Sequence, residues 1–454
     1  MNIKSIIIKS FVFICIIATA SCSNNDSNTS APNGSSSNID GFFPKPTADI
    51  VMYEINPTAF SASKNLQGIT NRLDNIKALG INTIWIMPIY PVGVVNSFGS
   101  PYCVKDYTSV RSSLGNLQDL KNLVSAAHQK GIAVILDWVA NHTSWDNSWI
   151  TANPNWYTHN SSGQIISPAG TPWNDVADLD FSNSAMRTAM INAMKFWVVE
   201  ANIDGFRFDA ADFVPYDFWQ QANTALNSIP NKQLILLAEG SRADHFTAGS
   251  QMNFAWDYLG TEKNVFGTTQ GNATSFFTTN TTEYAFVPSG KKKLRFTTNH
   301  DESNIATPIS VYGGMNGALA ASVIAIYLQG VPLIYCGQEV GVSSTATYNG
   351  INTIDWNSNG SMLSAYTSLL GFYNTSSTAR TGTLVNYNDS NVVAFSKTSA
   401  TQQILVLVNV RNTSKTFVVP NALQGNWINA LNESAITLSG SINLTGFQYL
   451  ILKR

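Results

Sequence analysis

The stretch GFRFDAADF, residues 205–213, begins as a short apolar run and reaches a carboxylate at Asp209. Two further runs end in the same way, LILLAEG at Glu239 and RFTTNHDE at Asp301. Each run is typical of a buried strand that is closed by a polar loop. Because α/β barrels place their catalytic residues at the carboxyl ends of parallel strands, the three acids are the candidate catalytic residues.

The composition is that of a large globular protein with few charges. Of 454 residues, 44% are hydrophobic and 12% are charged, and the net charge is −2. A nearly neutral chain gives no electrostatic case for binding nucleic acid or an anionic membrane. The length suits a barrel of about 250 residues or more with additions.

The central part of the chain alternates between apolar runs and helical windows. One such window is 116–130, in which Leu117, Leu120 and Val124 fall on one face. This alternation over residues 45–376 predicts a (β/α)8 TIM barrel. We expect its strands at 51–55, 81–87, 132–137, 203–209, 234–239, 254–258, 295–299 and 331–336.

One interval is too long for a single strand–helix unit. Asp137 and Asp209 are 72 residues apart, where one unit needs roughly 30. The surplus predicts an inserted domain at 141–181 on the catalytic face. Its indole rings either stack on a ligand or form a small core of the insertion itself. Five of the 11 tryptophans lie in or beside it: Trp138, Trp145, Trp149, Trp156 and Trp173.

After a last helical stretch near 361–373 the pattern changes to short β-rich runs separated by turn residues. Residues 380–454 therefore predict a C-terminal antiparallel β-sandwich domain. We expect its strands at 392–397, 403–410, 416–419, 435–438 and 447–452. No acid or histidine cluster occurs there, so no chemistry is assigned to this domain.

Residues 1–22 have the pattern of an export signal, with two lysines before an apolar stretch too short to span a membrane. The stretch closes on Thr19-Ala20-Ser21-Cys22, which resembles the cleavage box of bacterial lipoproteins. The resemblance implies a lipid on Cys22 and a cell-envelope location, on a membrane face left open. The alternative is an ordinary secretory signal. The Ser/Asn-rich residues 23–44 predict a flexible tether.

Two cysteines, Cys103 and Cys336, remain in the folded part of the chain. Two thiols form neither a disulfide framework nor a zinc site. Whether the two thiols pair is left open by the sequence.

The strand-end motifs resemble those of the α-amylase family of glycoside hydrolases, glycoside hydrolase family 13. Four lie at the ends of the third, fourth, fifth and seventh strands: Asp137-Trp-Val-Ala-Asn141-His142, Gly205-Phe-Arg207-Phe-Asp209, Glu239 and Asn299-His300-Asp301. Two more resemble motifs of the insertion and of the loop after the second strand: Asp178-Leu-Asp180, and Tyr102 with Asp106-Tyr107.

The resemblance implies a retaining hydrolase in which Asp209 is the nucleophile, Glu239 the general acid/base and Asp301 the transition-state stabiliser. The residue types suit acetal cleavage, which needs one carboxylic acid and one carboxylate. Arg207 lies two positions before Asp209, on the same side of a strand, and can hold that carboxylate ionised. Asp137 would in turn hold Arg207 in place.

The resemblance also implies the remaining site residues. His142, Arg207 and His300 would contact the sugar, and Tyr102 would stack beneath it. A structural calcium would be bound by Asn141, Asp178 and a backbone carbonyl near position 213, since oxygen ligands suit calcium. Asn141 could equally be a capping residue.

One departure from the family pattern concerns the leaving group. Members that act on long α-glucans often carry a Lys-His pair three and four residues after the nucleophile, where this chain has Asp212 and Phe213. This leaves the leaving-group preference open.

The sequence thus predicts a monomeric, exported hydrolase of α-1,4-glucosidic bonds in starch or maltodextrins. One alternative is a glucan transglycosylase, or a cyclomaltodextrinase- or neopullulanase-like enzyme of the same fold. Another is a non-catalytic glucan-binding protein built on a decayed barrel, against which the three intact acids speak.

Overall fold

The computed structural model describes residues 41–267, 270–345 and 352–454. The expected export signal with Cys22, and the tether through residue 40, lie outside the described residues. Within those ranges no helix has both the length and the apolar character needed to cross a membrane.

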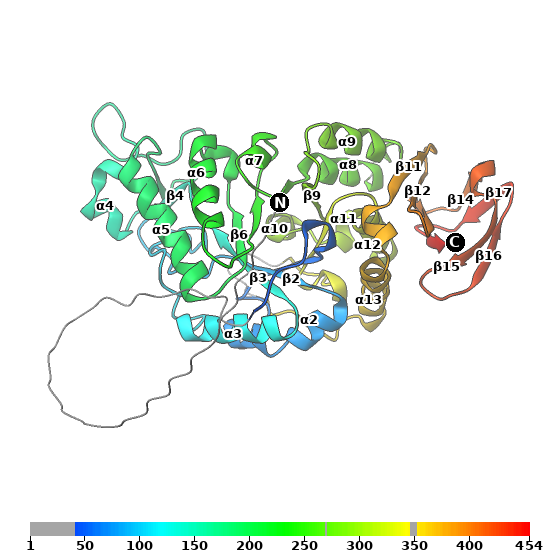
Figure 1. Ribbon diagram of the computed structural model, residues 1–454, viewed down its shortest axis with the longest axis horizontal. Helices are drawn as coiled ribbons and strands as arrows, with labels where there is room; N and C mark the ends of the chain where they lie inside the picture. The colour runs from blue at the N-terminus through cyan, green and yellow to red at the C-terminus, as the bar shows by residue number, and fades with distance from the viewer. Residues whose placement is uncertain (1–40, 268–269, 346–351) are drawn as a thin grey trace, which may run out of the picture. The chain divides into compact units, whose positions relative to one another are not determined.

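Eight parallel strands close into a barrel in the order β1-β10-β9-β8-β7-β6-β3-β2. Figure 1 labels β2, β3, β6 and β9 among them, with helices around them. Each neighbouring pair is parallel, which confirms the predicted (β/α)8 architecture. The strands are β1 (Met52–Ile55), β2 (Thr83–Ile86), β3 (Ala133–Trp138), β6 (Gly205–Phe208), β7 (Ile235–Ala238), β8 (Met252–Phe254), β9 (Lys292–Arg295) and β10 (Val331–Tyr335).

Helices surround the barrel. α3 matches the predicted window at 116–130, and a capping box between Asn116 and Asp119 starts it. The helices of the barrel region are α1 (Leu66–Thr70), α2 (Leu73–Leu79), α3 (Leu117–Gln129), α5 (Ser184–Glu200), α6 (Tyr216–Asn227), α7 (Asp244–Thr247), α8 (Trp256–Phe266), α9 (Ser275–Tyr284), α10 (His300–Ile305), α11 (Pro308–Val311), α12 (Met315–Tyr327), α13 (Gly360–Thr375) and α14 (Ser377–Thr381).

Two predicted strand positions were wrong. The strand expected at 254–258 is β8, which ends at Phe254, and Trp256 already begins α8. An aromatic residue at every second position fits a strand, but here the pattern runs across a strand–helix junction. The strand expected at 295–299 is β9, which ends at Arg295; the Asn299 side chain instead caps α10 by accepting from the Glu302 N–H. Asp301 therefore lies in the first turn of a helix.

Alternation along the strands decides which side chains enter the barrel. Met52 belongs to a cluster inside the barrel, whereas Tyr53 belongs to the cluster between strands and helices. Glu54 follows Met52 by two positions and is on the inner side. On β3, Ile135 belongs to the same inner cluster, and Asp137, two positions later, therefore also points into the barrel. The inner rows thus change from apolar to ionisable at the carboxyl ends of the strands.

The insertion between β3 and α5 has little regular structure. It contains α4 (Ser148–Ala152), η2 (Pro154–Trp156) and a two-stranded antiparallel pair, β4 (His142–Ser144) and β5 (Val176–Asp178). Trp149 and Trp156 pack edge to face at 5.1 Å, and Trp138 is buried against Tyr107. These three tryptophans therefore belong to the protein core. Trp173, by contrast, lines the cavity described below, so both predicted roles of the tryptophans occur.

The C-terminal domain is antiparallel, as predicted, with a six-stranded sheet and a two-stranded sheet. Leu405 and Leu407 of the larger sheet cluster with Phe417 and Leu444 of the smaller. β11, β15 and β17 were not expected, because they are largely exposed and carry no apolar run. The strands are β11 (Thr383–Tyr387), β12 (Val392–Thr398), β13 (Gln403–Asn409), β14 (Lys415–Val418), β15 (Gly425–Asn429), β16 (Ala435–Leu438), β17 (Ser441–Leu444) and β18 (Tyr449–Lys453).

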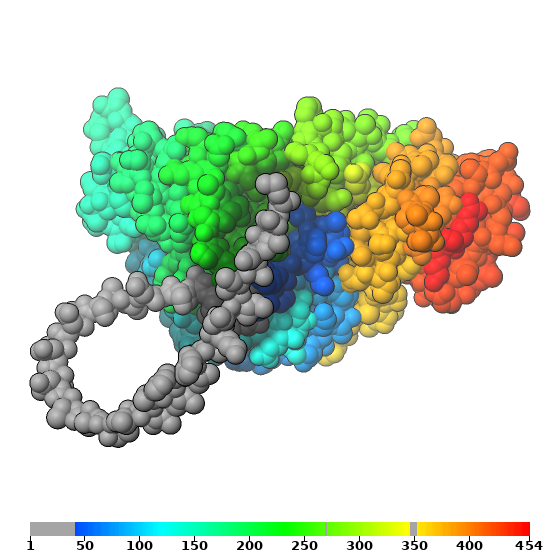
Figure 2. Space-filling view, in the orientation of Figure 1, coloured from blue at the N-terminus to red at the C-terminus, as the bar shows by residue number. Residues whose placement is uncertain are grey.

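The other face of the larger sheet packs on the barrel region. Figure 2 shows the C-terminal residues, in orange and red, directly beside the yellow residues of the barrel region. Phe395 and Val406 belong to the same hydrophobic cluster as the barrel helices. Arg411 also donates from Nη1 to the Val265 carbonyl at the end of α8. The domain thus extends the core of the barrel and lies outside the cavity described next.

Candidate active site

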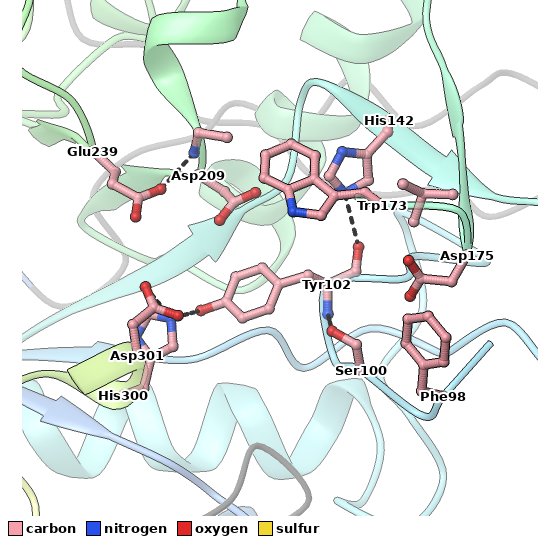
Figure 3. Close-up of a pocket in the computed structure, with 12 residues that line it drawn as sticks. Phe98, Ser100, Tyr102, His142, Trp173, Asp175, Asp209, Glu239, His300 and Asp301 are labelled. Atoms are coloured by element: carbon pink, nitrogen blue, oxygen red, sulfur yellow. Dashed lines mark hydrogen bonds and ion pairs between the residues drawn. The ribbon is translucent and has the colours of Figure 1, made fainter. Parts of the chain in front are cut away.

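A cavity of about 420 Å³ lies at the carboxyl ends of the barrel strands (Figure 3). It brings together six of the residues predicted from sequence: Tyr102, His142, Asp209, Glu239, His300 and Asp301. Arg207 lies beneath its floor, fully buried. The remaining lining residues are Phe98, Ser100, Trp173, Asp175, Val176 and Ala210.

One buried guanidinium holds the carboxylates of the floor. Arg207 Nη1 donates to Asp137 Oδ1 and to Asp209 Oδ1, each at 2.8 Å. Its Nη2 lies 2.9 Å from Glu239 Oε1. Strand alternation explains the arrangement, because Arg207 lies on β6, Asp209 follows it by two positions at the end of that strand, and Glu239 directly follows β7. The predicted contacts of Arg207 with Asp209 and Asp137 are both confirmed.

Glu239 has the environment of a general acid. Its Oε2 accepts from the Ala210 N–H at 2.6 Å. Ala210 has a φ of 45°, a left-handed conformation that costs a residue with a Cβ some strain and that often marks functional sites. Burial raises the pKa of Glu239 to about 7, with Arg207 opposing the shift and the Asp209 and Asp301 carboxylates adding to it. A large share of Glu239 is therefore protonated at neutral pH.

Asp209 titrates at a lower pH than Glu239. Burial raises the pKa of Asp209 to about 6, and the Arg207 guanidinium limits that rise. Arg207 thus favours the ionised carboxylate, as expected, although burial outweighs it. At neutral pH Asp209 is mostly ionised while Glu239 carries much of the proton, which is the division of states that a nucleophile and an acid require.

His300 links the cavity to a residue that the sequence reading missed. Its Nδ1 lies 2.5 Å from Glu54 Oε1, and its Nε2 lies 2.7 Å from the Tyr102 hydroxyl. Burial opposes the charged ring, but the carboxylates of Asp301 and Glu54 outweigh burial and raise the pKa of His300 to about 9. His300 is thus a cation at neutral pH. The sequence held one signal for Glu54: it is an acidic residue inside an apolar run, VMYEI at 51–55, where a buried carboxylate needs a partner.

Three aromatic side chains also line the cavity. We call Phe98, Tyr102 and Trp173 the aromatic wall, and Asp209 and Glu239, which Arg207 holds from beneath, the charged wall. In Figure 3, Glu239 lies at the left and Phe98 at the right. Phe98 is 71% exposed and lies on the loop after β2. Nothing in the sequence marked Phe98, because a single aromatic residue in a loop has no periodicity.

Trp173 packs against two neighbours at the rim. Its ring lies 5.6 Å from His142 and 5.2 Å from Phe213. Burial lowers the pKa of His142 to about 4, so this imidazole is neutral at pH 7. Its Nε2 lies 3.3 Å from the Tyr102 carbonyl, which fixes the ring at the edge of the cavity.

Asn141 and Asp178, the predicted calcium ligands, lie at the β4–β5 pair and outside the cavity lining. Asn141 is buried and precedes a strand, so a helix-capping role is wrong for it. Burial, with a smaller contribution from Asp180, raises the pKa of Asp178, a cost that a cation would relieve. Both side chains offer an oxygen ligand of the kind that calcium prefers. No group of three or more His, Cys, Asp or Glu suited to a metal occurs in the described part of the chain.

Cys103 and Cys336 are both buried and free. The Cys103 thiol donates to the Asp175 carbonyl at 3.2 Å, and Cys336 Sγ accepts from the Asn56 N–H at 3.4 Å. The two thiols thus have separate surroundings.

Comparison with known proteins identifies the family. The profile of the alpha amylase catalytic domain matches residues 32–164 and 155–400. Alpha-amylase 3 of Dictyoglomus thermophilum is 27% identical over 65% of this chain and 64% of its own length. The probable oligo-1,6-glucosidase 2 of Bacillus subtilis is 27% identical over 68% of each. The chain spans about two thirds of these relatives, and 39% of the alpha-glucosidase of Apis mellifera, at 30% identity.

Solved structures agree over nearly the whole described chain. An alpha-amylase from Lactobacillus plantarum has a TM-score of 0.81 at 26% identity, covering 90% of this chain and 99% of that one. A maltogenic alpha-amylase from Thermotoga neapolitana has a TM-score of 0.80, also at 26% identity, covering 89% and 98%. The chain belongs to the alpha-amylase family of glycoside hydrolases.

Proposed function

We propose that this protein is a retaining glycoside hydrolase that cleaves α-1,4-glucosidic bonds of starch or maltodextrins by double displacement. The observation that carries the proposal is the charged wall. One buried arginine holds Asp209 and Glu239 beside the same cavity, with pKa values of about 6 and about 7. That pair provides an ionised nucleophile and a protonated acid at the same pH.

In the first step, an Asp209 oxygen attacks the anomeric carbon while Glu239 gives its proton to the glycosidic oxygen, and the bond to the leaving sugar breaks. In the second step, Glu239 takes a proton from water, whose oxygen displaces Asp209 from the anomeric carbon. Arg207 keeps Asp209 anionic before attack and stabilises it again as it leaves. Net retention of the α-configuration follows from the two inversions.

The α-1,4-glucan substrate rests on similarity to proteins described as alpha-amylases and as a maltogenic alpha-amylase. Proteins described as oligo-1,6-glucosidase and glucan 1,6-alpha-glucosidase are also similar, so linkage needs a direct test. The aromatic wall suits a pyranose ring, whose apolar face stacks on an indole or phenol.

The test is a product profile on maltoheptaose, soluble starch, pullulan and β-cyclodextrin, with the anomeric protons followed by NMR. We expect the α-anomer of shorter maltodextrins to form first from maltoheptaose and starch, and nothing from Asp209→Asn. First appearance of the β-anomer would refute the nucleophile role. Preference for pullulan or cyclodextrin would favour the neopullulanase- or cyclomaltodextrinase-like alternative, and products longer than the substrate would favour transglycosylation.

We also propose that Cys22 carries a lipid that anchors the enzyme to the cell envelope. The small residues before Cys22 and the Ser/Asn-rich tether after it support this. We expect Cys22→Ser to move the enzyme from the membrane to the soluble fraction. Cys15→Ser, inside the apolar stretch of the signal, is the matched control and should remain membrane-bound. Equal membrane association of wild type and Cys22→Ser would contradict the anchor.

A further inference from the structure

Asp212, one of the two residues that depart from the family pattern, connects the loops that carry the two catalytic acids. It lies in η3 (Ala211–Phe213), three residues after Asp209. Its Oδ2 accepts from the Ser241 N–H at 3.0 Å, and its Oδ1 accepts from the Arg242 N–H at 3.3 Å. Both donors lie in the segment that directly follows Glu239. A lysine in place of Asp212 could accept neither bond.

A buried imidazole completes the surroundings of this carboxylate. His245 Nε2 lies 3.2 Å from Asp212 Oδ1, and the His245 side chain is 1% exposed. His245 belongs to α7, the helix that continues the chain after the acid/base loop. The Asp212 carboxylate is therefore held by the backbone of the loop and lies against the first helix beyond it.

The residue between Glu239 and Ser241 is a glycine for a steric reason. Gly240 has a φ of 157°, and a Cβ built on it would lie 2.3 Å from Asp212 Oδ1 and 2.7 Å from His245 Cε1. Only a residue without a Cβ allows the carboxylate to approach the backbone at this point. We call Asp212, Gly240, Ser241, Arg242 and His245 the brace.

Arg242 ties the same two loops in the opposite direction. Its Nη1 donates to the Asp212 carbonyl at 3.0 Å and to the Val214 carbonyl at 3.1 Å. Asp212 of the loop after β6 thus binds the backbone of the loop after β7, and Arg242 of the loop after β7 binds the backbone of the loop after β6. Between these contacts and the cavity, the Ala211 N–H donates to the Glu239 carbonyl at 2.9 Å. The brace therefore adjoins the bond from Ala210 to the Glu239 carboxyl group.

We propose that Asp212 is a positioning residue for Glu239. By tying the loop after β7 to the loop after β6, it fixes the direction in which the Glu239 carboxyl group faces the glycosidic oxygen and keeps the bond from Ala210. Asp212 does not line the cavity, so it acts through Glu239 and without contact to substrate. The proposal rests on the hydrolase function proposed above.

The role predicts a dependence on the leaving group. A sugar leaving group needs a proton from Glu239, whereas fluoride leaves without one. Displacing the acid should therefore slow cleavage of maltoheptaose but hardly affect formation of the glycosyl-enzyme from α-maltotriosyl fluoride. The value of kcat/KM isolates this step for both substrates, because it covers events up to the first irreversible one.

The experiment compares Asp212→Ala, Asp212→Asn and Gly240→Ala with wild type on both substrates, with melting curves as the check of folding. For Asp212→Ala we expect kcat/KM on maltoheptaose to fall about tenfold, a part of what general acid catalysis contributes. On the fluoride we expect a loss below about twofold. Asp212→Asn keeps an acceptor oxygen, so its kcat/KM on maltoheptaose should lie between those of wild type and Asp212→Ala. Gly240→Ala leaves the carboxylate intact but displaces the brace, so it should show the same selectivity.

Asp217→Asn is the matched control, because Asp217 is an exposed acid of the adjoining α6 that pairs with Arg187; it should behave as wild type on both substrates. Equal losses on the two substrates, or no loss on either, would overturn the positioning role. A rise in KM for maltoheptaose at unchanged kcat would overturn it as well, since Asp212 would then bind the leaving sugar. If the Ala variant fails to fold, Asp212→Asn and Gly240→Ala decide. Wild type that turns over neither substrate would instead contradict the proposed function.

Discussion

The charged wall and the aromatic wall face the same cavity but are built differently. Arg207 is fully buried on β6, Asp209 directly follows that strand, and Glu239 directly follows β7. Phe98 and Trp173 lie on loops, outside any helix or strand. Strands hold side chains rigidly, whereas loops tolerate change in sequence and shape. The comparison indicates that the bond-breaking chemistry is fixed by the barrel and that sugar recognition depends on segments added to it.

The charged wall should give the largest effects. We expect Asp209→Asn and Glu239→Gln each to lower kcat on starch by about 10²-fold or more, since acid–base assistance alone contributes 10²–10⁴-fold. Both replacements keep the size of the side chain, so the melting temperature and glucan binding should change little. Either variant retaining more than about a tenth of wild-type kcat would contradict the role of that residue.

The same wall should set the pH dependence. Asp209 must be ionised, so kcat/KM should fall as the pH drops below about 6, and Glu239 must be protonated, so it should fall as the pH rises above about 7. Because the two acids interact, these limits describe the pair. With α-maltotriosyl fluoride, which needs no proton, the alkaline fall should disappear. Identical alkaline limbs for both substrates would refute Glu239 as the acid.

The aromatic wall should affect binding more than chemistry. We expect Trp173→Ala to raise KM for maltoheptaose about fivefold with little change in kcat, because a stacking contact is worth about 1 kcal/mol. Trp173→Phe keeps a flat ring and should recover part of the loss. Trp156→Phe is the control, since Trp156 packs on Trp149 away from the cavity. A fall in kcat with unchanged KM for Trp173→Ala would contradict the assignment of the aromatic wall to substrate binding.

The two walls also differ in how far the sequence predicted them. Asp209 and Glu239 follow apolar runs, and strand alternation then dictates their direction. Asp301 reaches the cavity from the first turn of α10, because the Asn299 cap starts a helix where a strand was expected. Glu54 was missed because its partner His300 is 246 residues away in sequence.

The loop-borne contacts were harder still to predict. Phe98 enters the cavity, and Asp212 meets the backbone after Glu239, only when separate loops close over the barrel. No local pattern encodes such contacts.

The smallest expected effect on activity concerns calcium, which would act on the aromatic wall and leave the charged wall unchanged. A site at Asn141 and Asp178 would fasten the β4–β5 pair of the insertion that carries Trp173, beside His142. A metal that binds only the folded state stabilises it by about 2.7 kcal/mol at 100 times its dissociation constant. Excess chelator should therefore lower the melting temperature and raise KM before kcat falls. Asp178→Ala should melt like the chelated wild type and bind no calcium by calorimetry, whereas Asp180→Ala should still bind it. If the melting curves with and without chelator superimpose, and Asp178→Ala melts like wild type, the insertion is held by its own packing.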